Sequence, residues 1–529
     1  MVIYLLCGLL LTLVYYQLTK NKNYFRNKPI PTLPSKLLFG STGPLMLRQI
    51  SFAGFIESIY NVFPCAKIIG MFDIVTPVFV VRDPELIKRV MVRDFDHFAD
   101  QVPVFGSNEY DHPNLLVARS LSFLDCQRWK SMRATVSPAF TGSKMRQMYE
   151  LIVECSENAV QHYLEETRAR GPQVYEMKNI FTRYASDVIA SCTFGIQTNS
   201  SKDPETELYV MGKDMMNFKK ISAVLKLIGF RVCPWLMARL GIDIFAERYN
   251  SHFKSLIFAT IKEREGKGFF RRDLIQLLLQ AKNGQLKACP QEKEQNEGFA
   301  TAQEATVGTA QKTLSDTEIV AQCLIFFLAG YETVSTSLLF LTYELAINPE
   351  VQNRLHVEVM DTHASLDGKP LSYDAMQRMK YMDMVVTEVL RKWPPLPASD
   401  RMCVKDYTLD DGNGLSFTID KGTALWVPIR ALHHDPKYFP NPDLFDPERF
   451  NDERKGSVDP ATFIPFGIGP RNCIGSRFGL AMMKTIVYYL LLHFSIERTA
   501  KTQVPPVLTK GFVEVIPENG VHLEFRPRV

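Results

Sequence analysis

Apolar residues recur every three or four positions over most of the chain, which is the spacing of one face of an α-helix. Shorter runs rich in β-branched residues are typical of strands. The helical pattern covers residues 145–168, 272–282, 316–347, 349–362, 374–392 and 477–492, and the strand pattern covers 66–71, 78–81, 407–409 and 423–427. The expected fold class is therefore mainly α with small β-sheets.

The first segment of the chain has a different pattern. Residues 2–18 are almost wholly apolar and uncharged, and as a helix they would span roughly 25 Å, close to the ~30 Å core of a bilayer. A cleaved signal would need a basic start and a small-residue cleavage site, and a mitochondrial presequence would be amphipathic and rich in arginine. This segment has none of these features. The aromatic and basic residues that belong at a membrane interface follow in order: Tyr15, Tyr16, Lys20, Lys22, Arg26 and Lys28. We therefore expect residues 1–19 to be an uncleaved transmembrane anchor whose basic flank faces the cytosol.

The remainder shows no internal repeat and no Gly/Ser linker that would divide it. Three prolines, at 29, 31 and 34, favour a stiff spacer, so we expect residues 20–40 to be a basic, proline-rich linker and 41–529 to be one domain. The polar stretch 284–312 is expected to be a surface loop between two helices. The apolar stretch 225–245 has two interpretations that stay open: a core helix, or a surface that dips into the membrane.

Composition and charge exclude several classes of function. The 529 residues are 46% hydrophobic and 22% charged, with a net charge of +4 and no basic run interleaved with aromatic residues, which argues against nucleic-acid binding. The ten cysteines include no C-x-x-C pair, so neither a disulfide framework nor a paired-ligand zinc site is indicated.

One cysteine lies in an unusual setting. Residues 466–475 read Phe-Gly-Ile-Gly-Pro-Arg-Asn-Cys-Ile-Gly and fit F-x-x-G-x-R-x-C-x-G. Gly469 permits a turn that a side chain would block, and Arg471 can pair with an anion through its guanidinium fork. Gly475 lets a flat, bulky ligand approach the backbone. Cys473 precedes the predicted helix 477–492, whose N-terminus favours an anion and lowers the pKa of a thiol.

This loop resembles the haem-binding signature of the cytochrome P450 superfamily, and the wording of the motifs is similar to that of insect xenobiotic-metabolising P450s and their vertebrate drug-metabolising relatives. The resemblance implies the P450 fold, with a single haem domain behind the anchor. It also implies haem b (iron protoporphyrin IX) with Cys473 thiolate as the axial iron ligand. The other residues that it assigns to the haem are Phe466, Gly475 and, for the two propionates, Trp129, Arg133, Arg401 and Arg471.

A second motif lies in the predicted helix 316–347. The sequence Ser-Asp-Thr-Glu at 315–318 is a capping box that opens this helix, and Ala-Gly-Tyr-Glu-Thr follows at 329–333. Thr333 is able to bond back to the carbonyl of Ala329, a common local feature of helices. The resemblance implies that Thr333 helps to deliver protons to dioxygen, with Glu332 in the relay. Val334 departs from the family, which usually has Thr or Ser there.

A third motif is structural. Glu388 and Arg391 are three residues apart on a predicted helix and can pair with each other, which alone indicates only a salt bridge. The resemblance adds Arg449 and implies a buried network of the three behind the cysteine loop, with a role in folding and haem retention.

Together these motifs imply a monooxygenase that inserts one atom of O2 into a hydrophobic small molecule, either a xenobiotic or an endogenous lipophile. No flavin or dinucleotide motif is present, so electrons from NADPH need a separate NADPH–cytochrome P450 reductase, and cytochrome b5 is a further candidate donor. The expected location is the endoplasmic reticulum membrane, with contacts to lipid and with the catalytic domain on the cytosolic face. Candidate substrate contacts are Phe326, Ala329, residues 102–121 and residues 397–399, and a candidate basic surface for the reductase comprises Arg128, Lys130, Arg477 and Lys484.

Other classes of function remain as alternatives. A haem-thiolate isomerase or dehydratase would act on peroxides without O2 or a reductase, but retention of Glu332 and Thr333 argues against it. A haem sensor or carrier without catalysis would have a packed distal side. A zinc or purely structural protein is not favoured by the ligand spacing.

Overall fold

The structure is a computed structural model. It describes residues 19–102, 115–218, 220–268, 270–286, 298–302, 313–511 and 515–528, together with Tyr4, Thr12, Tyr15 and Tyr16. Most of the predicted anchor, residues 103–114 of the candidate substrate loop, and most of the polar stretch 284–312 lie outside the described residues.

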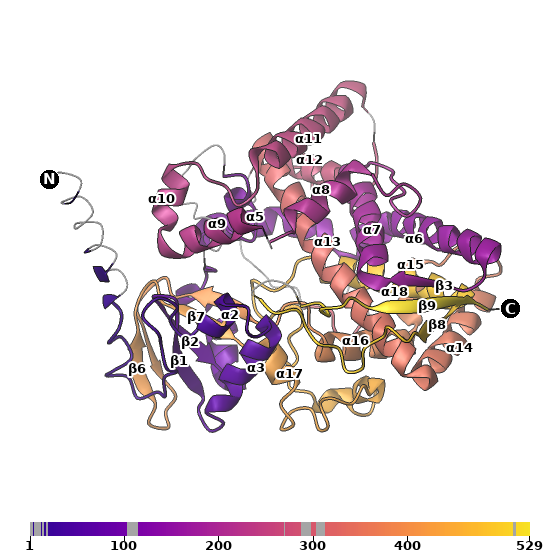
Figure 1. The fold of residues 1–529 in the computed structure, drawn as a ribbon. Helices are drawn as coiled ribbons and strands as arrows, with labels where there is room; N and C mark the ends of the chain where they lie inside the picture. Colours follow the sequence, from indigo (N-terminus) through magenta and orange to yellow (C-terminus); the bar gives the residue numbers. More distant parts are fainter. Residues whose placement is uncertain are drawn as a thin grey trace.

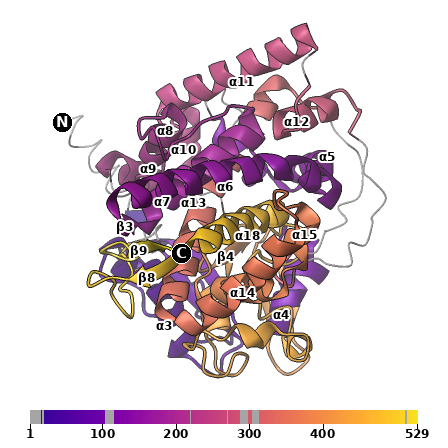
Figure 2. The same cartoon turned by 90° about the vertical axis from the view of Figure 1, so that its right-hand side faces the viewer.

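Helices make up most of the fold (Figure 1). The longer ones are α3 (Phe52–Val62), α5 (Cys126–Val136), α6 (Gly142–Arg170), α7 (Met177–Ile189), α9 (Ile221–Val232), α11 (Glu247–Lys267), α13 (Asp316–Ile347), α14 (Pro349–Ser365), α16 (Lys380–Lys392) and α18 (Ser476–His493). The shorter ones are α2 (Gly43–Met46), α4 (Pro84–Lys88), α8 (Glu207–Met215), α10 (Pro234–Arg239), α12 (Leu274–Lys282), α15 (Tyr373–Arg378) and α17 (Ile429–His433). Figure 2 shows α6 crossing the molecule, with α11 and α12 on one side and α14, α15 and α18 on the other.

Within the described residues, three small sheets accompany the helices. The largest has the order β1 (Ile68–Asp73), β2 (Thr76–Val81), β7 (Ala424–Val427), β4 (Ser399–Met402), and its β2–β7 pair is parallel while the other two pairs are antiparallel. The second has the order β3 (Gln173–Glu176), β9 (His522–Pro527), β8 (Phe494–Arg498), and the third pairs β5 (Tyr407–Asp410) with β6 (Ser416–Ile419). The predicted fold class, mainly α with small β-sheets, is confirmed.

Helix α13 is the centre of the helical core. It begins at the predicted capping box, in which the Ser315 hydroxyl accepts from the Glu318 amide and the Glu318 carboxylate accepts from the Ser315 amide. It ends at Asn348, directly before Pro349, which cannot continue a helix. Among the described helices it alone is long and apolar enough to span a bilayer, but 67% of its most apolar window is buried inside the protein. A helix that is apolar on every side is buried in a core, and Figure 1 shows α13 passing between the other helices.

The predicted helix 374–392 is interrupted, which corrects the expectation of one continuous element. The structure has α15 and α16 separated by Met379, whose ψ of 90° is outside the helical range. The carboxylate of Glu358 on α14 accepts hydrogen bonds of 2.8 Å from the amides of both Tyr381 and Met382. These amides belong to the first turn of α16, so a distant side chain caps the helix and stabilises its separate start.

The polar stretch 284–312 contains one anchored segment, residues 298–302. The ring of Phe299 lies 5.2 Å from that of Phe450 and 5.5 Å from that of Phe463, and Ala300 is 5% exposed. The Phe299 amide donates a hydrogen bond to the Asp383 carboxylate. This part of the stretch is therefore packed against the body of the protein, whereas a polar surface loop was expected for all of 284–312.

Candidate active site

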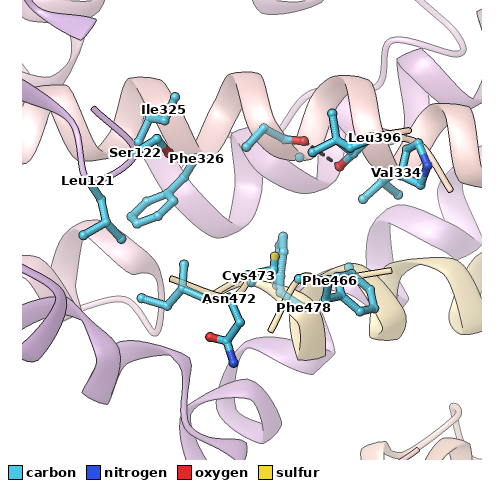
Figure 3. Close-up of a pocket in the computed structure, with 18 of the residues that line it drawn as sticks. Leu121, Ser122, Ile325, Phe326, Val334, Leu396, Phe466, Asn472, Cys473 and Phe478 are labelled. Atoms are coloured by element: carbon cyan, nitrogen blue, oxygen red, sulfur yellow. Dashed lines mark hydrogen bonds between the residues drawn. The ribbon is translucent and has the colours of Figure 1, made fainter. Parts of the chain in front are cut away.

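A cavity of about 360 Å³ lies between α13 and the loop that precedes α18, within the usual range for small-molecule sites. Its lining is mainly apolar. Figure 3 shows Phe326 and Val334 on α13 facing Phe466, Cys473 and Phe478 across this space. The two motifs found in the sequence, which are about 140 residues apart along the chain, thus face one cavity.

The cysteine loop is shaped by glycine. Gly469 has a φ of +78°, and a Cβ there would collide with the carbonyl oxygen of Met91, so the predicted need for glycine is confirmed. The Cys473 amide donates a hydrogen bond of 2.8 Å to the Phe466 carbonyl and closes the loop. Gly475 lines the cavity with no atom within 4 Å of an added Cβ, so a side chain there would project into open space.

Cys473 is exposed, but to the cavity that it lines. Burial within the protein raises the pKa of its thiol, while a hydrogen bond with the Gly475 backbone and the charge of Arg133 act in the opposite direction. The helix N-terminus predicted a lowered pKa, whereas in the absence of a bound cation desolvation of the thiolate is the larger effect. A cation bound to sulfur would supply the missing stabilisation.

The other described cysteines differ from Cys473. Cys192 also lines the cavity, but it is only 1% exposed and burial raises its pKa well above the ordinary value. Cys155, Cys323 and Cys403 are not among the described residues that line the cavity. Among the described cysteines, Cys473 alone combines exposure to the cavity with a glycine-shaped loop, which suits a ligand of a bound group.

On the opposite wall, α13 presents Ala329, Gly330 and Thr333 to the cavity. The Thr333 hydroxyl donates a hydrogen bond of 2.7 Å to the Ala329 carbonyl, the back-bond that the sequence suggested. A Cβ at Gly330 would lie 2.9 Å from the side chain of Ile189 on α7, so glycine lets the two helices pack closely. The described part of this wall holds two hydroxyls, those of Thr333 and Ser337, in otherwise apolar surroundings.

Glu332 occupies a different position from Thr333. Its carboxylate receives a hydrogen bond of 2.7 Å from the ammonium of Lys178 on α7, and it is not among the described residues that line the cavity. Lys178 also donates to the hydroxyls of Ser335 and Thr336, each at 2.8 Å. The structure therefore brings Thr333 to the cavity and places Glu332 in a polar cluster between α7 and α13.

The residues predicted for the propionates gather beside the cavity. Trp129, Arg133 and Arg471 line it, and the Arg471 guanidinium lies 4.5 Å from the centre of the Trp129 ring. In the structure Arg133 donates to the carbonyl and side-chain oxygens of Asn472 at 3.0 and 2.9 Å. Arg471 donates to the carbonyls of Ala99 and Leu124.

Arg401 supplies a test of whether an anionic group fits here. It is 1% exposed, and its Nε has no hydrogen-bond partner among the described residues. Burial lowers its pKa to about 10, and burial followed by the charge of Arg401 lowers that of Arg471 to about 9. The carboxylates nearby, Asp100 at 3.6 Å from Arg471 and Asp400 beside Arg401, offset this only in part, and two further carboxylates would provide the remaining counter-charge. The residues present therefore fit the two propionates of a haem.

Glu388, Arg391 and Arg449 form the network that was predicted. Glu388 and Arg391 are both fully buried and joined at 2.7 Å, and Arg449 reaches Glu388 at 3.3 Å. Arg391 further donates to the carbonyls of His433 and Pro442. These backbone contacts tie α16 to the chain that leads toward the cysteine loop.

The structure also shows a residue that the sequence analysis did not single out. The neutral ring of His433 has its Nδ1 3.1 Å from the Arg391 carbonyl, and its Nε2 accepts from the Ile464 amide at 3.0 Å. A carbonyl only accepts and an amide only donates, so the Nδ1–H tautomer is fixed. Nothing local to His433 in the sequence indicates this bridge, because both partners lie about 30 to 40 residues away.

The predicted reductase surface requires a correction. Lys484 is 1% exposed and pairs with Asp383 at 2.8 Å, so it is a core residue and not part of a surface. It lies on the buried face of α18, where the neighbouring positions are apolar core residues. Arg128 has a 56% exposed side chain and Lys130 a 31% exposed one, paired with Asp96. Arg477 is half-buried.

The predicted substrate contacts are partly brought together. Phe326, Ala329, Leu121, Ala398 and Ser399 line the cavity. Phe326 packs edge-on against Phe140, with ring centres 5.0 Å apart. Residues 103–114 of the predicted contact loop lie outside the described residues.

Comparison with known proteins gives a consistent result. The family model for Cytochrome P450 matches residues 44–525. The chain is 40% identical to Cytochrome P450 9e2 of Blattella germanica, over 96% of this chain and 95% of that protein. It is 38% identical to Probable cytochrome P450 9f2 of Drosophila melanogaster (98% and 97%) and 32% identical to Cytochrome P450 6k1 of Blattella germanica (96% and 92%).

These matches extend over nearly the whole chain, so they cover the described residues that line the cavity and both motifs that face it. Members of this family bind haem through a cysteine thiolate, use O2 and a redox partner, and act on hydrophobic substrates. The chain therefore belongs to the cytochrome P450 family and is a haem-thiolate monooxygenase.

Proposed function

We propose that this protein is a microsomal monooxygenase in which Cys473 holds the haem iron and Thr333 assists proton delivery. The observation that supports this most directly is that both residues line one apolar cavity from opposite walls. The proposed substrates are lipophilic small molecules, including xenobiotics, because the lining offers large apolar surfaces and few polar groups.

The proposed haem site uses the chain as follows. Cys473 provides the thiolate, Gly475 leaves room for a flat ring and Phe466 lines the same space. Arg133, Arg401 and Arg471 neutralise the propionates, and Trp129 offers its indole N–H to them. When bound, haem supplies the activation of dioxygen and the insertion of one oxygen atom. The network of Glu388, Arg391 and Arg449 stabilises the chain behind the cysteine loop and so retains the group.

Proton delivery is proposed to pass through the α13 wall. The Thr333 hydroxyl can donate into the cavity when its bond to Ala329 opens, which makes it a positioned proton donor. Glu332 would supply protons to it from the polar cluster around Lys178. Glu332 must turn from Lys178 toward Thr333 to do so, which makes their ion pair a point of control.

The electron source is proposed to be NADPH–cytochrome P450 reductase, with cytochrome b5 as a second donor. The basic side chains of α5, the exposed Arg128 and the partly exposed Lys130, would contribute to a docking surface for an acidic partner. Lys484 has no part in it.

Membrane attachment is proposed to involve more than the anchor at residues 1–19. Large apolar side chains on and beside α9 and α10 are exposed: Leu225 63%, Trp235 50%, Leu236 39% and Leu240 62%. Arg231 of α9 pairs with Asp73 at the end of β1, so this helix lies against the sheet that follows the N-terminal segment. Apolar exposure on this scale supports the membrane-contact interpretation of residues 225–245 over the core-helix interpretation. The proposed location is the endoplasmic reticulum membrane.

The central test is spectroscopic and kinetic. Purified wild type, reduced and treated with carbon monoxide, should show the red-shifted absorption band of a thiolate-ligated haem, and Cys473→Ala should lose it. Cys192→Ala is the matched control because Cys192 also lines the cavity, and it should keep the band.

Reconstitution with the reductase distinguishes the remaining reactions. Coupled consumption of NADPH and O2 with formation of an oxygenated product would support the monooxygenase. Conversion of a peroxide substrate without NADPH would identify an isomerase or dehydratase instead, and no turnover of either kind would identify a haem carrier.

A further inference from the structure

Gln322 is a buried amide that the reaction does not use. It lies on α13 eleven residues before Thr333, which is about three helical turns and hence on nearly the same face of the helix. Its side chain is fully buried, beyond Ile325 and Phe326 at the end of the cavity.

The amide of Gln322 pairs with the backbone of one chain segment. Its Nε2 donates to the Arg119 carbonyl at 3.1 Å, and its Oε1 accepts from the Leu121 amide at 2.8 Å. Because the carbonyl only accepts and the amide only donates, the orientation of the side chain is fixed. These two hydrogen bonds join alternate residues, as in a β-ladder. They fix the distance of the segment from α13 and its register along that helix.

The segment continues directly into the cavity wall. Leu121 and Ser122 line the cavity, and Figure 3 shows them beside Ile325 and Phe326. Three residues after Leu121, the Leu124 carbonyl accepts a hydrogen bond of 2.7 Å from Arg471 of the cysteine loop. Residues 119–124 are therefore held at one end by α13 and at the other by the cysteine loop.

We propose that Gln322 is a specificity-determining positioning residue, which holds residues 119–124 against α13 and thereby sets the cavity wall formed by Leu121 and Ser122. This inference rests on the proposed function, because it concerns what that cavity accepts. Loss of the amide leaves the Arg119 carbonyl and the Leu121 amide without their partner in a buried place, so the segment must shift or open to water.

The chain offers a matched control. Gln352 on α14 is 3% exposed and bonds a backbone segment in the same manner, donating to the Ile496 carbonyl at 2.8 Å and accepting from the Ile496 amide at 2.9 Å. It is not among the described residues that line the cavity. Its Nε2 also donates to the Leu345 carbonyl at 3.0 Å, so the same substitution there removes at least as many amide-to-backbone bonds without touching the wall.

The experiment compares two probes that bind haem iron through nitrogen. Imidazole is small and reports only access to the iron, whereas clotrimazole carries three aromatic rings that must fit against the wall. Full-length Gln322→Leu and Gln352→Leu proteins are purified with haem, and the dissociation constants of both probes are measured from the shift of the main haem absorption band.

We expect the ratio of the clotrimazole to the imidazole dissociation constant to rise about tenfold in Gln322→Leu, because the loosened wall must be ordered on binding. The ratio should stay at its wild-type value in Gln352→Leu. Gln322→Glu keeps the shape of the side chain and should also raise the ratio, since a carboxylate cannot donate to the Arg119 carbonyl. It serves as the test if Gln322→Leu does not retain haem.

A ratio within about twofold of wild type in the haem-loaded Gln322 variants would overturn the inference, and so would an equal rise in Gln352→Leu. The outcome is separable from the proposed function. If wild type oxidises no lipophilic substrate with NADPH and the ratio still rises, the proposed reaction is refuted while the role of Gln322 in shaping the cavity is supported.

Discussion

Lys178 on α7 holds Glu332 on α13 through a hydrogen bond of 2.7 Å, while Thr333, the next residue of the chain, faces the cavity. One helical position thus separates a residue in a polar cluster from one in an apolar site.

This pair gives the first prediction. Lys178→Met should free Glu332 and change the rate of proton delivery, whereas Glu332→Gln should remove the acid and lower product formation about tenfold or more. The measurement is the rate of product formation as a function of pH together with the solvent deuterium isotope effect. An unchanged isotope effect in Glu332→Gln would contradict a role for this carboxyl in the relay.

Thr333→Ala should uncouple the reaction. Without the hydroxyl at the cavity, NADPH and O2 are still consumed, but the product formed per NADPH should fall about tenfold and reduced oxygen species should appear. The matched control is Thr342→Ala, which removes an equivalent back-bond of 2.9 Å to Leu338 in the same helix. Thr342 is not among the described residues that line the cavity, so equal uncoupling in both variants would count against Thr333.

His433 predicts a pH dependence of stability. Burial, followed by the charge of Arg391, lowers its pKa to about 3, whereas in the unfolded chain it is about 6.5. Between these values the unfolded state binds the extra proton, so stability falls as the pH falls below about 6.5. This one residue should reduce the free energy of unfolding by about 2 kcal/mol between about pH 7.5 and about pH 5.

His433→Gln, which cannot titrate, should flatten that dependence in urea unfolding experiments. The pKa of His434 is also lowered, by burial first, but His434 is present in both proteins and cancels in the comparison. Equal pH slopes for wild type and variant would show that His433 is not held neutral in the fold.

Charge reversal tests whether α5 contributes to the reductase surface and whether Lys484 of α18 belongs to the core. Arg128→Glu should raise the apparent KM for the reductase several-fold, more so at low salt, and leave the haem spectrum intact. Lys484→Glu should instead destabilise the protein, because two carboxylates would meet at the position of its 2.8 Å pair with Asp383. A folded Lys484→Glu protein with an altered KM alone would restore Lys484 to the docking surface.

Trp235 tests the membrane surface. In vesicles that contain brominated lipid chains, the fluorescence of the full-length wild type should be quenched, and Trp235→Phe should lose most of this quenching. Trp393, which is 7% exposed and stacked on Phe340, is the control, and Trp393→Phe should keep it. Quenching that persists in Trp235→Phe would place this surface in water.

The sequence by itself determined α6, α12, α13, α14 and α18, the two motifs that face the cavity and the family, because each depends on neighbours along the chain. It did not indicate α3, α7 or α11. The period of apolar residues predicted α13 to the residue, and the glycines of the cysteine loop followed from local backbone demands at Gly469. Residues 374–392 were predicted as one helix. The carboxylate that caps the start of α16 belongs to Glu358 on another helix, so nothing within the segment marks the break.

Only the tertiary structure decided which polar residues face the cavity and which are buried elsewhere. Sequence spacing placed Lys484 and Arg477 on one face of α18, but whether that face meets water depends on α16, which packs there and supplies Asp383. The same holds for Gln322 and His433, whose partners lie roughly 200 and about 30 to 40 residues away. Hydrogen bonds between distant segments leave no period in the sequence, so their roles appear only once the chain is folded.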